Sequence, residues 1–359
     1  MSRLAALALA IAASACAVGC QKDAGGPLPP PSPPPPPGPP LASDPVSATA
    51  SGNSGASFLM TATADVDVAY IALPPGSAPD GRVATIRNLR TGDSILVAVA
   101  EGGFDPAAIP AIAGDNVGIV VRDGSGNVVF QPPVLVVSAR RPPIVVRTNP
   151  PPRKRDVPLN THIVIVFSEP IDAATLTGTS LELRRGSSLV TGSVVFRDSD
   201  HVTALFIPTE PLAPATTYTL AVSQEIRDLD GDLLETPVTV EFTTATSGGY
   251  EEYFVDATAP LSGDQVGDSV VIDHTVRVLD GDGVGIEGAI IRFRVSTGHV
   301  VPDVTTSGLG GLTTGQWTFA GVIGVFPTQA TAELSACASN SPTRCDQYWP
   351  ILVIGFNPP

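Results

Sequence analysis

Charged, aromatic and histidine residues are all scarce in this sequence. Of 359 residues, 15% are charged, 5% are aromatic and only four are histidines. The four histidines stand apart from one another, without the paired spacing of a zinc site, and they are His162, His201, His274 and His299. The sequence also lacks a GxSxG elbow, a P-loop and a GxGxxG turn after a strand. We therefore predict a protein with no catalytic residues, no metal centre and no cofactor.

Basic residues are few as well. The chain has 20 Lys and Arg against 35 Asp and Glu, which gives a net charge of −15 at pH 7. Binding to a nucleic acid backbone depends on Lys and Arg, and anionic lipid repels an acidic surface. The charge therefore argues against nucleic acid and against adsorption to anionic lipid as partners. The acidic charge is explained by an exported surface that stays soluble or, alternatively, by a cationic partner.

Proline, glycine and β-forming residues are abundant instead. The chain contains 37 Pro and 35 Gly, and its many Val, Ile and Thr residues alternate with turn residues at short intervals. This composition favours β-sandwiches over helices. A chain of this length has room for two or three domains. We predict an all-β protein built from tandem sandwiches.

The first residues have the pattern of an export signal. Arg3 supplies a charged start, and residues 4–15 form an apolar stretch that is too short to span a bilayer. The segment ends at Ala17-Val18-Gly19-Cys20, which resembles the lipobox of bacterial lipoproteins. The resemblance implies that residues 1–19 are removed and that Cys20 is acylated. The protein would then be attached to a membrane through its lipid.

Two features complicate this prediction. Ala17 occupies the position where the lipobox usually has Leu, and residues 13–16, which end in Cys16, form a second box of the same kind. Cys20 is preferred because the polar residues 21–23 follow it directly and because cleavage before Cys16 would shorten the apolar stretch. Gln21 is not the Asp that retains some lipoproteins at an inner membrane. The resemblance therefore favours a bacterial outer membrane or cell surface.

Residues 27–40 are almost continuous proline. Proline fixes φ and donates no hydrogen bond, so this stretch is expected to form a semi-rigid polyproline II rod. At about 3.1 Å per residue the rod would reach roughly 45 Å. We interpret residues 20–43 as a lipidated cysteine followed by a spacer.

Residues 44–140 form the first predicted sandwich. Short apolar runs such as residues 69–73, 94–99 and 117–121 are separated by breakers, with the spacing of a sandwich. The end of this unit resembles one type of bacterial Ig-like repeat, in which a Gly-Asp turn leads a strand into a hairpin. Asp123 and Asn127 fall in that hairpin, where turn chemistry explains them better than cation binding.

Residues 141–246 carry the strongest resemblance. The run from Ile163 to Asp172, the run from Leu212 to Leu220 and the segment from Thr239 to Thr244 resemble the SbsA-type bacterial Ig-like domain. Residues 163–167 alternate between two apolar faces, as a strand buried on both sides requires. Leu212, Pro214 and Tyr218 have the spacing of a tyrosine corner, in which a buried phenol bonds back to the backbone. Tyr218 is therefore predicted to be structural.

A cluster of acidic residues follows in the same unit. Asp228, Asp230 and Asp232 suggest a calcium loop, but the glycine and the last Glu of an EF-type loop are misplaced here. We interpret the cluster as a hairpin turn and keep calcium as the alternative.

Residues 250–357 resemble the invasin/intimin type of bacterial Ig-like domain. The segment from Asp268 to Val278 is predicted to be a strand, residues 280–283 a turn, and the segment from Ile286 to Val295 the strand that pairs back. Trp317 is predicted to lie in the core. Cys337 and Cys345 are eight residues apart in an exported chain, so they are expected to form a disulfide rather than to remain free thiols.

Together, these patterns imply a lipid-anchored surface protein of structural or adhesive function. One alternative is a binding module for an envelope glycan or protein, which would need exposed aromatic residues. Another is an accessory subunit of a periplasm-facing assembly. The partner predicted beyond the membrane is an envelope or extracellular protein or glycan that the sequence does not identify.

Overall fold

The structure is a computed structural model that describes residues 37–48, 66–246, 253–256, 262–280, 283–321, 330–339 and 347–356. These residues form β-strands and one short 3-10 helix, η1 (Leu309–Gly311), so the prediction of an all-β protein is confirmed. Residues 37–359 make up one compact unit, and the domain boundaries predicted within it stay predictions. The predicted leader, Cys20, most of the rod and Cys345 lie outside the described residues. Among the described residues, no helix has the length and hydrophobicity that a membrane crossing requires.

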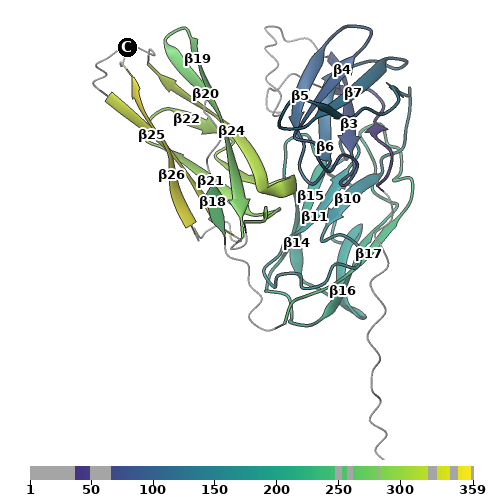
Figure 1. The fold of residues 1–359 in the computed structure, drawn as a ribbon. Coiled ribbons are helices and arrows are strands. Elements are labelled where there is room, and N and C mark those ends of the chain that lie inside the picture. Colours follow the sequence, from purple (N-terminus) through teal and green to yellow (C-terminus); the bar gives the residue numbers. More distant parts are fainter. Residues whose placement is uncertain are drawn as a thin grey trace, which may run out of the picture. The chain divides into compact units, whose positions relative to one another are not determined.

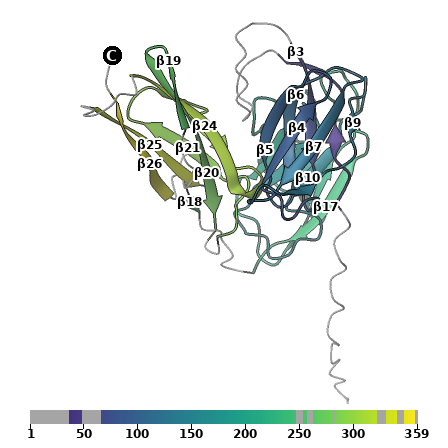
Figure 2. The ribbon, with the colours of Figure 1, turned by 45° about the horizontal axis from the view of Figure 1, so that its top comes forward.

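The first sandwich consists of two antiparallel sheets (Figure 2). In one sheet β3 pairs with β1, β2 and β6, and in the other the order is β5-β4-β7-β8, with β9 also on β7. Their inner faces meet in an apolar core that includes Ile71, Ile86 and Ile119. The strands are β1 (Leu41–Ala42), β2 (Val46–Ala48), β3 (Val66–Leu73), β4 (Val83–Asn88), β5 (Ser94–Ala98), β6 (Phe104–Pro110), β7 (Asn116–Arg122), β8 (Val128–Phe130) and β9 (Leu135–Val136).

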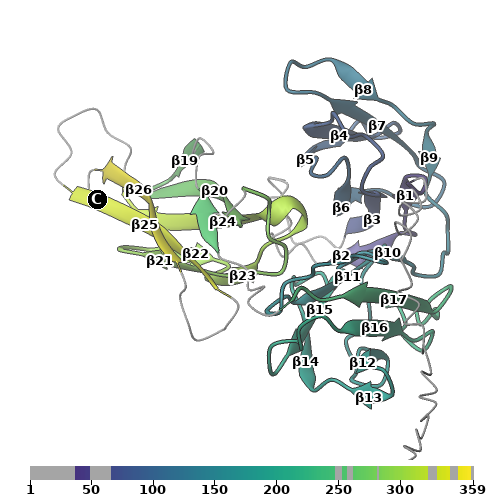
Figure 3. The same ribbon diagram turned by 60° about the horizontal axis from the view of Figure 1, so that its bottom comes forward.

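The middle sandwich has two four-stranded sheets, in the orders β10-β11-β15-β14 and β13-β12-β16-β17 (Figure 3). β11 is buried on both faces, as its apolar run predicts, and every side chain in it is 0% exposed. Its odd-numbered side chains enter the main core, whereas Val164 and Val166 pack with Leu205 in a second cluster. The strands are β10 (Val145–Asn149), β11 (Ile163–Phe167), β12 (Leu181–Arg185), β13 (Ser188–Leu189), β14 (Gly192–Phe196), β15 (Thr203–Pro208), β16 (Thr217–Val222) and β17 (Val238–Thr243).

In the last sandwich one sheet has the order β18-β20-β24-β22, with β19 also paired with β20 (Figure 1). The second sheet has the order β23-β21-β25-β26. Trp317 is fully buried, as predicted, with its ring 4.5 Å from that of Phe319. Its indole N–H donates to the carbonyl of Thr297 at 2.8 Å, which satisfies its one polar atom. The strands are β18 (Phe254–Asp256), β19 (Ser262–Val266), β20 (Ser269–Leu279), β21 (Ile290–Val295), β22 (His299–Val301), β23 (Val304–Thr306), β24 (Leu312–Ala320), β25 (Ala330–Ser339) and β26 (Gln347–Phe356).

One predicted pairing in the last sandwich is wrong. The turn after β20 exists, since the backbone N–H of Val284 donates to Asp280 Oδ1 at 2.8 Å. Beyond it, however, only the bridge between Leu279 and Gly285 joins the two segments. β21 then lies in the opposite sheet, paired with β23 and β25. The chain therefore crosses between sheets here, and Ile291 and Phe293 of β21 enter the core from the second sheet.

Candidate functional site

The predicted tyrosine corner is formed by the middle sandwich. The hydroxyl of Tyr218 accepts a hydrogen bond from the backbone N–H of Ala213 at 2.8 Å, and the side chain is 3% exposed. Its ring packs against Phe242, with centroids 5.7 Å apart. Leu212 is buried beside it, whereas Pro214 is exposed on the turn. This phenol is used to hold the chain where it enters β16, which is a structural role.

The acidic cluster after β16 forms a turn. Asp228 Oδ1 accepts the backbone N–H of Asp232 at 2.8 Å, and Asp228 N–H donates to the carbonyl of Asp232 at 3.1 Å. The carboxylate of Asp232 accepts hydrogen bonds from Nε and Nη2 of Arg140, and Asp230 is exposed. No group of three His, Cys, Asp or Glu among the described residues is arranged to hold a metal ion. These contacts are those of a hairpin turn, and calcium binding by the cluster stays an untested alternative.

Cys337 lies on β25 and is disulfide-bonded. It is buried, with a 1% exposed surface. Its predicted partner Cys345 lies outside the described residues, so the pairing of these two cysteines stays a prediction.

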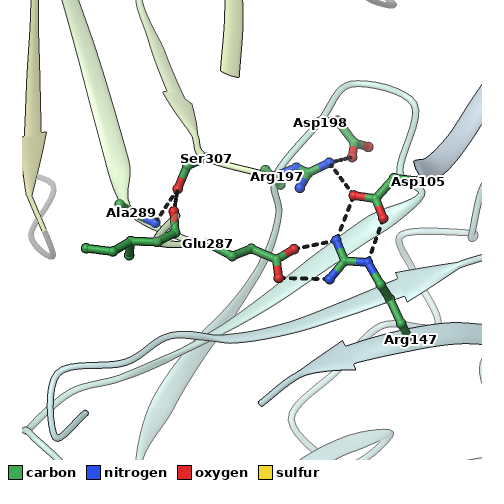
Figure 4. A network of polar contacts seen from close by, with 8 residues as sticks. Asp105, Arg147, Arg197, Asp198, Glu287, Ala289 and Ser307 are labelled. Carbon is green, nitrogen blue, oxygen red and sulfur yellow. Dashed lines mark hydrogen bonds and ion pairs between the residues drawn. The ribbon is translucent and has the colours of Figure 1, made fainter. Parts of the chain in front are cut away.

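The most extensive polar arrangement is an ionic junction that the sequence analysis did not single out. It is centred on Arg147 of β10, whose guanidinium lies between two carboxylates (Figure 4). Nε and Nη2 donate to the two oxygens of Asp105, each at 2.7 Å, and Nη1 donates to Glu287 Oε2 at 2.8 Å. Asp105 lies on β6 of the first sandwich and Glu287 lies before β21 of the last. A single side chain of the middle sandwich therefore binds both of the others.

A second arginine completes the junction. Arg197, which follows β14, places Nη2 3.8 Å from Asp105 Oδ2 and 3.9 Å from Asp198 Oδ2 (Figure 4). Asp198 in turn accepts the backbone N–H of Val202 at 3.0 Å. The two arginines face three carboxylates, so most of the buried charge is compensated within the group.

Burial makes these charges consequential. The side chains of Arg147 and Glu287 are 8% and 6% exposed. Burial opposes the charged form of Arg147, but attraction to Asp105 and Glu287 outweighs it and raises the pKa of the guanidinium. Burial likewise works against ionised Asp105, yet Arg147 and Arg197 lower the pKa of its carboxyl. A guanidinium held in this way stays protonated, so its role is to fix geometry and not to exchange protons.

The loop that carries Glu287 is shaped by a glycine and a serine. Gly288 has φ +79°, and a Cβ there would lie 3.3 Å from His162 Cβ in the middle sandwich. His162 Nδ1–H donates to the Gly288 carbonyl at 2.7 Å. Ser307 Oγ donates to the Ile286 carbonyl at 2.6 Å and accepts from the Ala289 N–H at 3.0 Å, as Figure 4 shows in part. Together these bonds hold Glu287 toward Arg147.

The first and middle sandwiches also meet through apolar and polar contacts. Val68 and Tyr70 of β3 form a small buried cluster with Val202, which precedes β15. Burial, helped by the nearby carboxylates of Asp200 and Asp198, raises the pKa of the Tyr70 phenol. The phenol is therefore neutral at ordinary pH, and the contact keeps its apolar character.

A family comparison bears on the middle sandwich. Residues 139–244 match the sequence model of a family described as "Bacterial Ig-like domain". The prediction of a bacterial Ig-like domain in this part of the chain is confirmed. The SbsA and invasin/intimin types stay predictions. A comparison with curated protein sequences finds no match.

Solved structures include several similar chains. The crystal structure of the S-layer protein rSbsC(31-844) is 16% identical, with a TM-score of 0.31; 59% of this chain and 25% of that chain are covered. The D0-D1 domain of intimin is 10% identical, with a TM-score of 0.19. The match covers 56% of this chain and 91% of that chain. Invasin, described as a bacterial integrin-binding protein, is 12% identical, with a TM-score of 0.16. The match covers 87% of this chain and 59% of that chain. This chain thus spans about a quarter of the S-layer chain's length.

Proposed function

We propose that the protein is a lipid-anchored component of a bacterial envelope that displays three Ig-like sandwiches as one stiff arm. Its role is structural or adhesive, and it is not an enzyme. The observation that carries this proposal is the position of Arg147, which binds a carboxylate of the first sandwich and a carboxylate of the last from the middle one.

The junction favours a stiff arm over flexibly linked beads. A guanidinium with bidentate bonds to two carboxylates loses much of its stabilisation if either neighbour moves away. Removing one partner of a buried ion pair costs about 3–5 kcal/mol, so independent movement of the sandwiches is expensive. An arm that transmits force or holds a binding surface away from a membrane benefits from this stiffness.

The anchor follows from the first 20 residues. The leader and the box ending at Cys20 supply a membrane attachment, and the proline-rich stretch supplies a spacer. Several acyl chains are needed for stable attachment, and the lipoprotein resemblance implies them. The arm would then begin at β1 (Leu41–Ala42), which pairs with β3 directly after the proline-rich stretch.

Metabolic labelling tests the anchor. The full chain is expressed in a bacterium that processes lipoproteins, with an alkyne fatty acid in the medium. We expect label on the wild type and on Cys16→Ser, but not on Cys20→Ser. Label that persists in Cys20→Ser would overturn the assignment of the anchor.

Cell-surface display is tested on the same strains. Protease added to intact cells should degrade the sandwiches of the wild type, and antibody raised against them should label whole cells. Adhesion of these cells to one another and to host matrix proteins is then compared with cells that carry Arg147→Met. Complete protection from protease would point to a periplasm-facing subunit instead.

A further inference from the structure

Three buried carboxylates lie where the first sandwich meets the middle one, outside the ionic junction. Asp44 follows β1, Glu169 follows β11 and Asp228 starts the turn after β16, and they are 1%, 1% and 4% exposed. Each has one oxygen that accepts a hydrogen bond. Asp44 Oδ2 accepts from the Arg141 N–H at 3.2 Å and Glu169 Oε1 from the Ser168 hydroxyl at 3.2 Å, and Asp228 Oδ1 accepts from Asp232 as described above.

The second oxygen of each carboxylate has no hydrogen-bond donor among the described residues. Within the described part of the chain, Asp44 Oδ1, Glu169 Oε2 and Asp228 Oδ2 are buried and receive no hydrogen bond. An ionised carboxylate only accepts, so two of them cannot satisfy each other. A buried and unpaired charge is very costly, and such groups neutralise instead. Something positive must therefore be shared among these oxygens.

The surrounding charges do not supply it. Arg140 is bound to Asp232, and the Arg141 guanidinium donates to the Ala42 carbonyl at 3.0 Å. A metal ion would need several converging ligands, and the described residues contain no such group of three. A proton needs only two oxygens. One proton between Asp44 and Glu169 would satisfy an orphaned oxygen on each.

We propose that Asp44 and Glu169 share one proton and that this bond is a pH-sensitive interlock between the first and middle sandwiches. Glu169 carries the proton and donates it in a hydrogen bond to the Asp44 carboxylate. Loss of the proton places two negative charges against each other in a buried contact. The contact then opens.

The titration of Glu169 supports this assignment. Burial, the hydrogen bond that a protonated Glu169 makes with Asp44, and repulsion from Asp44 and Asp228 raise the pKa of the Glu169 carboxyl to about 10, against the weaker opposing effect of the Ser168 hydroxyl. Burial also raises the pKa of Asp228, with further contributions from Asp232 and Asp44. Glu169 therefore holds a proton at neutral pH.

The direction of the pH effect follows from linkage. In the unfolded chain Glu169 loses its proton near an ordinary pKa of about 4.3, whereas the folded protein retains it. The stabilising contribution is full below that pH and is lost progressively as the pH rises toward about 10. Within this window each pH unit should increase the unfolding equilibrium constant about tenfold relative to a variant that cannot ionise.

Glu169→Gln provides that variant, because its amide donates to Asp44 at every pH. Urea unfolding of the full chain in detergent is measured from about pH 5 to about pH 9 for the wild type, Glu169→Gln and the exposed-site control Glu241→Gln. We expect the stability of the wild type and of Glu241→Gln to fall with pH relative to Glu169→Gln. After correction for the intrinsic rise of amide exchange with pH, hydrogen exchange at residues 41–44 should accelerate with pH in the wild type and in Glu241→Gln, but not in Glu169→Gln.

Asp44→Asn is the second variant, in case Glu169→Gln folds poorly. It removes the charge that faces Glu169, so the pH dependence should shrink there as well. Parallel stability curves for the wild type and Glu169→Gln across the whole range would overturn the proposal. The proposal would also be overturned if added calcium abolished the pH dependence of the wild type and a chelator restored it. A cation would then occupy the place of the proton.

Discussion

Arg147 and Glu287 form a doubly hydrogen-bonded ion pair that connects strand β10 to a loop 140 residues further along the chain. The same guanidinium also binds Asp105 on its other side. Both carboxylates are largely withdrawn from solvent, since the side chains of Asp105 and Glu287 are 18% and 6% exposed. The pairings are thus interdependent, and the consequences of breaking them can be measured.

Arg147→Met should destabilise the protein by about 3–5 kcal/mol, because it leaves two buried carboxylates without a partner. Combining it with Asp105→Leu and Glu287→Met should recover most of that loss, since an apolar replacement of a whole buried group is often tolerated. Urea unfolding provides the measurement. Arg184→Met is the control: Arg184 pairs with Glu182 but is 38% exposed, so its loss should cost about 0–1 kcal/mol. Equal effects at the two arginines would contradict the role of the junction.

Gly288→Ala should weaken the attachment of the last sandwich to the middle one. Alanine at this position strains the backbone, because φ is +79°, and its Cβ lies 3.3 Å from His162 Cβ. Gly283→Ala is a matched control, because Gly283 has φ +81° but open space around its Cβ position. Both variants should lose about 1 kcal/mol from backbone strain. Only Gly288→Ala should also accelerate hydrogen exchange in the loop of residues 286–289, and equal behaviour of the two glycines would argue against close docking there.

Tyr218→Phe should cost about 1–2 kcal/mol, because the Ala213 N–H then loses its acceptor in a partly buried turn. The ring still fills the core, so the variant should fold normally. Thermal unfolding gives the size of the loss, and Thr217→Ala on the exposed neighbouring position provides the comparison. If Tyr218→Phe lowers the stability no more than Thr217→Ala does, water replaces the phenol hydroxyl as the acceptor of the Ala213 N–H.

The sequence predicted local features well because they depend on neighbouring residues. The alternating run of β11 and the core position of Trp317 follow from side-chain periodicity and from a single bulky apolar residue. The junction could not be predicted in this way. Arg147 is separated from its partners by 42 and 140 residues, and an arginine on a strand ordinarily indicates a solvent-exposed face.

The errors have the same origin. A turn at residues 280–283 predicted a hairpin, but β21 pairs instead with β23 and β25, which follow it in the chain and are not indicated by the turn residues. Glu169 likewise appears in the sequence as one polar residue at the end of a strand. Its burial becomes apparent only when β1 and the residues after it are placed against the middle sandwich.

Asp115 should make the first sandwich sensitive to acid. Its carboxylate organises a turn by accepting hydrogen bonds from Arg90, from Asn88 Nδ2 at 2.7 Å and from the Ile112 N–H at 3.0 Å. The hydrogen bond from Arg90 is the largest of the effects that lower the pKa of Asp115, and burial opposes it. A lowered pKa means that the stabilisation is present above the ordinary value of about 3.9 and is lost as the pH falls through the folded-state value.

Asp115→Asn should therefore be less stable than the wild type near neutral pH, and this difference should diminish below about pH 4. Thermal unfolding across that range measures the difference, with Asp80→Asn as the exposed control in the same sandwich. A deficit in Asp115→Asn that is the same at every pH would show that the shape of the side chain matters there rather than its charge.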